Sequence, residues 1–68
     1  MPTAIPSLKE IEATVTRMEE RYRDHRLFAD YLRLKERFDA DLSDTRDRAL
    51  ARSAALMLIK YESENSKG

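Results

Sequence analysis

Residues 7–67 read SLKEIEATVTRMEERYRDHRLFADYLRLKERFDADLSDTRDRALARSAALMLIKYESENSK. This stretch contains neither proline nor glycine, because the two prolines are Pro2 and Pro6 and the single glycine is Gly68. A sheet protein of this size needs turn residues between its strands, whereas helices need none in their interiors. The stretch therefore predicts an all-α protein with a single domain, residues 1–68. We expect the ends, residues 1–6 and 63–68, to be flexible.

The first predicted helix begins at a capping box, Ser7-Leu8-Lys9-Glu10. Apolar residues then recur at spacings of three and four, which is the pattern of a helix that packs lengthwise on another helix. These residues are Leu8, Ile11, Val15, Met18 and Tyr22. After His25 the apolar stripe changes phase and continues through Leu27, Phe28, Tyr31, Leu34 and Phe38. We favour one long helix, about residues 8–38, with an offset stripe; the alternative is a short break near Asp24-His25.

A second helix, about residues 44–61, is predicted after the turn-favouring segment 39–44, with Asp41 or Ser43 as its cap. Its main apolar side is formed by Ala49, Leu50, Ala54, Met57, Leu58 and Tyr61. Residues 54–59 are apolar nearly all round, which indicates burial against two neighbours. Two helices of these lengths predict an antiparallel hairpin that completes a bundle by self-association or by docking on a partner. A single continuous coiled coil is the less favoured alternative, because the phase shift interrupts its register.

The residues that catalysis and metal binding require are scarce in this sequence. Among 68 residues there is no cysteine and one histidine, His25, and there is no glycine-rich loop to hold phosphate. Ser7 and Ser43 are explained as helix caps, and the paired carboxylates as a solvated face. We therefore expect no enzyme activity, no cofactor, no metal and no small-molecule substrate. Because no apolar run approaches the ~20 residues that span a bilayer, we also expect no membrane association and a cytoplasmic location.

The leading functional prediction is a non-catalytic protein–protein interaction module. A lone hairpin leaves apolar surface exposed, which a protein partner or a second copy would cover. A small helical adaptor, co-chaperone or regulatory subunit would act in this way, and the chain is expected to form a homodimer. The predicted interface consists of Tyr22, Arg26, Leu27, Phe28, Tyr31, Leu56 and Ile59.

The alternative prediction is a hairpin dimer that binds nucleic acid, RNA in particular. Arginine is dense between residues 17 and 37, and the candidate phosphate contacts are Arg17, Arg21, Arg33 and Arg37. The balance of 13 basic and 13 acidic residues counts against this function, since nucleic-acid-binding proteins carry a positive footprint. In size and hairpin layout the chain resembles small plasmid RNA-binding hairpin dimers and the small helical co-chaperones of bacterial secretion systems. The resemblance is one of architecture, so it transfers no functional residue.

Overall fold

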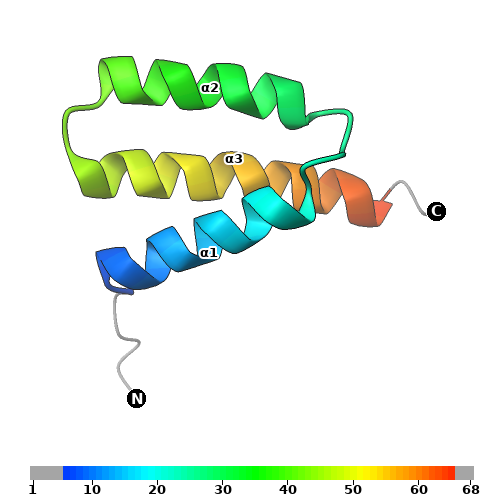
Figure 1. Cartoon of the computed structure of the whole chain (residues 1–68), viewed down its shortest axis with the longest axis horizontal. Coiled ribbons are helices and arrows are strands. Elements are labelled where there is room, and N and C mark those ends of the chain that lie inside the picture. The colour runs from blue at the N-terminus through cyan, green and yellow to red at the C-terminus, as the bar shows by residue number, and fades with distance from the viewer. Residues whose placement is uncertain (1–5, 66–68) are drawn as a thin grey trace.

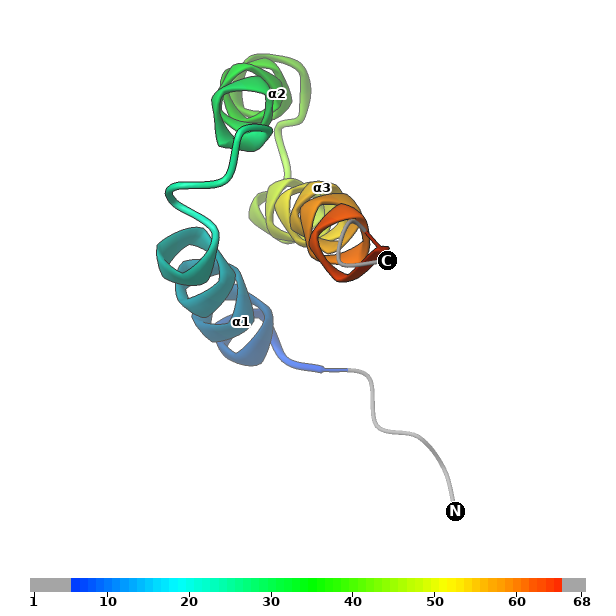
Figure 2. The same ribbon diagram turned by 90° about the vertical axis from the view of Figure 1, so that its right-hand side faces the viewer.

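Residues 6–65 fold into three helices joined by short connections. The computed structural model describes residues 6–65, which contain α1 (Leu8–Arg21), α2 (Phe28–Asp41) and α3 (Thr45–Asn65) (Figure 1). The last helix, α3, is the centre of the fold, because α1 and α2 each pack closely against it, whereas the backbones of α1 and α2 do not approach each other (Figure 2). After α2 the chain turns, so that α3 runs back beside α2, and α1 crosses α3 on another side (Figures 1 and 2).

The predicted long helix over residues 8–38 is wrong, and the alternative with a short break is confirmed. The helix ends at Arg21 and resumes at Phe28. The two apolar stripes on either side of the break point in different directions, so a continuous helix would leave one of them exposed. The break allows each stripe to pack on α3 separately, and the apolar burial that results offsets the lost helical hydrogen bonds.

The connection between α1 and α2 supplies hydrogen bonds of its own in place of the helical ones. The His25 N–H donates to the Tyr22 carbonyl at 2.9 Å, and the Phe28 N–H donates to the His25 carbonyl at 2.9 Å. The imidazole Nδ1 of His25 accepts from the Leu27 N–H at 3.1 Å. His25 is thus a turn residue that satisfies the first amides of α2, which otherwise lack helical partners.

The two other helix starts are capped by side chains. At α1 the Ser7 hydroxyl accepts from the Glu10 N–H at 3.2 Å and donates to the Glu10 carboxylate at 3.3 Å, so the predicted cap forms. At α3 the cap is Asp44 and neither Asp41 nor Ser43, because the Asp44 carboxylate accepts from the Arg46 N–H at 2.8 Å. The helix then runs to Asn65, past the predicted end near residue 61. The parts of the predicted flexible ends at 1–5 and 66–68 lie outside the described residues.

The core lies where α1 and α2 meet α3. Its buried members are Ile11, Val15, Tyr22, Tyr31, Ala49, Ala55, Leu56 and Ile59. Partly buried apolar side chains from α1, α2 and the connection surround them: Leu8, Met18, Leu27, Phe28 and Phe38. The small residues Ala49 and Ala55 lie on the inward side of α3, where they let neighbouring helices approach closely.

Polar side chains of α1 and α2 also contact each other beside this core. The Tyr31 hydroxyl, on a side chain only 1% exposed, donates to the Glu19 carboxylate at 2.5 Å. The Lys35 ammonium lies 3.5 Å from the same carboxylate oxygen. Burial, followed by the hydrogen bond to Glu19 and its negative charge, raises the pKa of Tyr31 well above its usual range. Tyr31 therefore remains a neutral donor at physiological pH and holds the two helices in register.

Candidate protein-docking surface

Four of the seven residues predicted to form the interface are instead buried in the core of the chain itself. Leu56 is fully buried, Ile59 and Tyr31 are nearly so, and Tyr22 is 8% exposed. The expectation that Leu56 and Ile59 face outward is therefore wrong. Once the first helix is broken, α1 and α2 both cover the side of α3 that carries these residues.

The other three predicted interface residues lie in and next to the α1–α2 connection. Arg26 is exposed and forms an ion pair with Glu62 of α3 at 2.6 Å, so its guanidinium is used within the chain. Leu27 and Phe28 are partly buried against the core, and the rings of Phe28 and Tyr31 lie 5.3 Å apart. These residues fasten the connection to α3.

Most of the apolar surface that remains uncovered lies on the opposite side of α3. The other large exposed apolar side chains among the described residues are Leu32 and Leu34 of α2, so the prediction that Leu34 continues the buried stripe is wrong. We call Leu50, Ala54, Met57, Leu58 and Tyr61 the outer face of α3. Its large side chains are strongly exposed: Leu50 by 45%, Met57 by 51%, Tyr61 by 68% and Leu58 by 69%. Figure 2 shows α1 and α2 on one side of α3, and the outer face borders the grooves between α3 and these helices, with Leu50 and Met57 toward α1 and Leu58 toward α2. The sequence pattern had assigned these residues to the main core-facing side.

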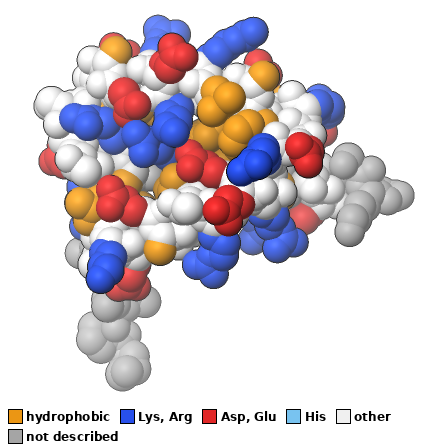
Figure 3. Space-filling model, viewed as in Figure 1, with side chains coloured by type: hydrophobic (Ala, Val, Ile, Leu, Met, Phe, Trp, Pro, Cys, Tyr) orange, Lys and Arg blue, Asp and Glu red, His pale blue; other side chains and the backbone are white. Residues whose placement is uncertain are grey.

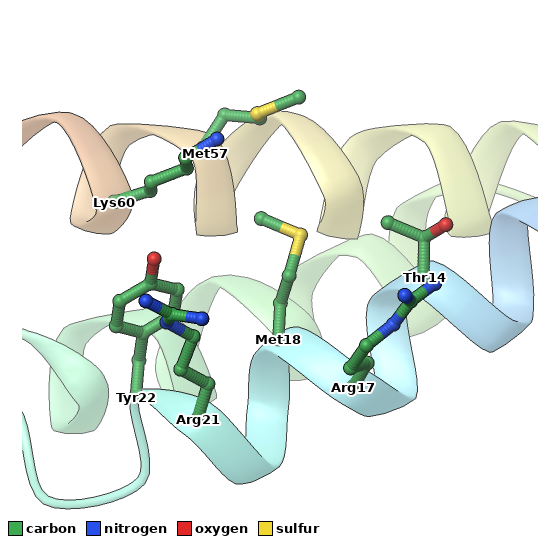
Figure 4. Close-up of a pocket in the computed structure, with 7 residues that line it drawn as sticks. All are labelled: Thr14, Arg17, Met18, Arg21, Tyr22, Met57 and Lys60. Atoms are coloured by element: carbon green, nitrogen blue, oxygen red, sulfur yellow. The ribbon is translucent and has the colours of Figure 1, made fainter.

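A groove between α1 and α3 borders the outer face. Figure 4 shows its wider part, a cavity of about 430 Å³, with Met18 pointing from α1 toward α3. Three cations line it, Arg17 and Arg21 from α1 and Lys60 from α3. Within residues 6–65 no carboxylate forms an ion pair with any of them, so the groove has a basic end with unneutralised charge.

The same groove continues toward the start of α1 and changes character there. Thr14 lines both parts, and beyond it lies a second cavity of about 270 Å³. Glu10 and Ile11 of α1 and Leu50 of α3 line this second part. Glu10 is the one carboxylate among the residues that line this part, which we call the acidic end, and the Arg46 guanidinium donates to the Pro6 carbonyl there at 3.0 Å. Thr14 lies between the acidic end and the basic end.

The structure divides the four arginines that were predicted to contact nucleic acid. Arg17 and Arg21 line the basic end of the groove, whereas Arg33 and Arg37 lie on α2. Arg33 lies 3.6 Å from the Asp30 carboxylate, and Arg37 lies 3.9 Å from that of Asp41. The face shown in Figure 3 mixes basic and acidic side chains around a small apolar area between α2 and α1. This face has no continuous basic stripe for a phosphate backbone to follow.

The part of the chain that the structure describes contains no cluster of three or more His, Asp or Glu side chains that could hold a metal ion. Over the same residues, no helix combines the length and the apolarity needed to cross a bilayer. No protein family, curated protein or solved structure matches the chain.

Proposed function

We propose that this chain is a non-catalytic protein–protein interaction module, a small helical adaptor, co-chaperone or regulatory subunit that docks helix to helix. The observation that carries the proposal is the exposed outer face of α3. Its members lie at spacings of four, three and four residues, with Leu58 beside Met57, so they form one continuous stripe along the helix. Exposed contiguous apolar patches of this kind mark interaction sites.

The stripe suits a helical partner in particular. Residues at alternating spacings of three and four present the seam into which the side chains of a second helix pack. Met57 adds an adaptable side chain and Tyr61 a large ring with a polar end, both common at protein interfaces. The helix beneath the stripe is held on its inward side by two neighbours, so it is a rigid support for docking.

Site-specific photocrosslinking in the cells that produce the protein tests the proposal. A benzophenone amino acid replaces Leu58, 69% exposed on the outer face, and in a matched control it replaces Leu32, 44% exposed between α1 and α2. We expect covalent protein adducts from position 58 and few from position 32. Equal labelling from the two positions, or no protein adduct from position 58, would refute docking through this face.

Binding to nucleic acid is the second candidate, and the basic end of the α1–α3 groove is the observation that favours it. Arg17, Arg21 and Lys60 line one cavity, and none of its other lining residues is acidic. Fluorescence anisotropy with mixed RNA and DNA at low salt tests this function, because phosphate contacts dominate binding under those conditions. A response that is abolished by the Arg17→Glu, Arg21→Glu double variant would favour nucleic acid, and a flat titration would exclude it.

A further inference from the structure

We infer that the occupant of the outer face of α3 is a second copy of the same chain, packed antiparallel about a two-fold axis beside Thr14. The inference rests on the proposed function, since it names the partner for the same surface. Two features of the described residues support it: the order of side chains along the outer face and the distribution of charge along the neighbouring groove.

The outer face is complementary to itself when it is reversed. With the axis between residues 55 and 56, Leu50 lies opposite Tyr61 of the second copy, and Ala54 lies opposite Met57. Each layer then joins apolar side chains, and the small Ala54 leaves room for the longer Met57. A closed dimer needs such an isologous patch, in which the same residues serve both copies.

The apolar seam is bounded at both ends by acidic side chains. Asp47 precedes it and Glu64 follows it, both exposed and at positions that continue the same spacing. In the reversed pairing these two residues lie opposite each other at the solvent-exposed margins, where repulsion is weak because salt screens it. The seam is thereby limited to the segment from Leu50 to Tyr61.

The charge along the α1–α3 groove selects the antiparallel direction. An antiparallel pair places the basic end of one copy, with Arg17 and Arg21, beside the acidic end of the other, with Glu10. In a parallel pair the two-fold axis would run along α3, so the two grooves would lie on opposite sides of the seam and neither basic end would meet an acidic end. Only the reversed arrangement brings opposite charges of the two grooves together, so the groove favours the antiparallel direction.

The absence of native cysteine makes the geometry directly testable by crosslinking. At a rise of ~1.5 Å per residue, position 54 lies about 5 Å along the helix axis from its equivalent in an antiparallel pair, and position 50 about 17 Å. A short bismaleimide should therefore join two Ala54→Cys chains efficiently and two Leu50→Cys chains poorly. Equal crosslinking of both variants would instead indicate a parallel pair and overturn the inference.

Sedimentation of the purified full chain measures the assembly itself. We expect the mass to rise from 8.0 kDa toward twice that value as concentration increases from low micromolar to about 0.5 mM. Leu58→Lys, a change at an exposed position, should keep the helical circular dichroism spectrum and abolish the increase. A wild-type chain that stays monomeric over this range overturns the inference.

A charge exchange tests the direction of packing independently. Arg21→Glu should weaken the dimer about tenfold, because two attractive contacts become repulsive. The double variant Glu10→Arg, Arg21→Glu restores opposite charges across the two-fold axis and should recover dimerisation. Failure of the double variant to dimerise while its helix content is retained contradicts the antiparallel pairing.

The failures of the two proposals are distinguishable. If the purified chain is monomeric but position 58 crosslinks to a different protein in cells, the outer face remains a docking surface and only the second copy is excluded. If position 58 gives no protein adduct and the chain is monomeric, both proposals fail.

Discussion

Two leucines two residues apart on α3 allow the orientation of this helix to be tested. Leu56 is fully buried and Leu58 is 69% exposed. Truncation of a buried leucine to alanine removes its packing and leaves a cavity, which costs about 2–5 kcal/mol. Because Leu56 contributes to a core formed by all three helices, we expect Leu56→Ala to cost about 3–4 kcal/mol. Leu58→Ala should change the unfolding free energy of the monomer by less than about 0.5 kcal/mol.

These costs are large for so short a chain. At ~0.05–0.15 kcal/mol per residue, 68 residues give a total stability of roughly 3–10 kcal/mol, so Leu56→Ala removes a large part of it. A milder change, Ile59→Val, should cost ~1 kcal/mol and leaves a folded protein to measure.

Urea unfolding followed by circular dichroism at low micromolar concentration provides the measurement. The low concentration matters, because association through the outer face would add a contribution from Leu58. A second series at a hundredfold higher concentration should reveal a loss for Leu58→Ala that is absent at the lower one. If Leu58→Ala costs as much as Leu56→Ala at low concentration, α3 is oriented as the sequence pattern suggested and the core described above is wrong.

Three further changes test individual contacts. Tyr31→Phe should cost ~1 kcal/mol at pH 7 through the lost hydrogen bond. Because the folded state raises the pKa of Tyr31, the contribution of Tyr31 to stability is complete below about pH 10 and is lost as the pH rises above that value. The melting temperature of Tyr31→Phe should therefore fall less between pH 7 and pH 12 than that of the wild type. The variant Tyr61→Phe, at an exposed position, is the control and should fall as the wild type does. Ser7→Ala should lower stability by about 1 kcal/mol in urea melts through loss of the α1 cap. Arg48→Lys should lower it by ~1–2 kcal/mol, since the guanidinium donates to the carbonyls of Leu42 at 2.7 Å and of Ser43 at 2.8 Å, and lysine has no fork to bridge two acceptors.

The helical class and the starts of α1 and α3 follow from local features of the sequence. The absence of proline and glycine, the cap at Ser7 and the turn-favouring residues near Asp44 act within a few residues of their positions. The break at residues 22–27 is a different kind of feature. Its sequence signal is a change of phase in the apolar stripe, and the same signal fits a stutter in a continuous helix. The choice between them depends on how much apolar surface each packs on α3, which is a tertiary property.

The orientation of α3 was mispredicted for a related reason. Both sides of α3 are apolar, so the periodicity of apolar residues hardly indicates which side faces the core. The sequence pattern favours the side with more large side chains. The structure buries the side with Ala49 and Ala55, on which two helices can approach at once, and Arg52 of that side pairs with Asp39 of α2 at 2.7 Å. Small residues beside Leu56 were the available signal. They indicate close helix packing, whereas a count of large apolar residues does not.

The reversed orientation changes the functional argument more than it changes the fold. In a two-helix hairpin, each apolar helix face would be only partly buried. Every residue of such a face would then be an equally good candidate for docking. In the three-helix arrangement, α3 is held by two neighbours on one side and carries a second apolar seam on the other. The residues that stabilise the core and the residues available for docking therefore lie on different sides of α3. Leu56 and Leu58 illustrate this separation, since Leu56 is fully buried and Leu58 is 69% exposed at the edge of the groove between α2 and α3. An exposed apolar seam with no role in the fold promotes aggregation, and this cost is the physical argument for the docking function that we propose.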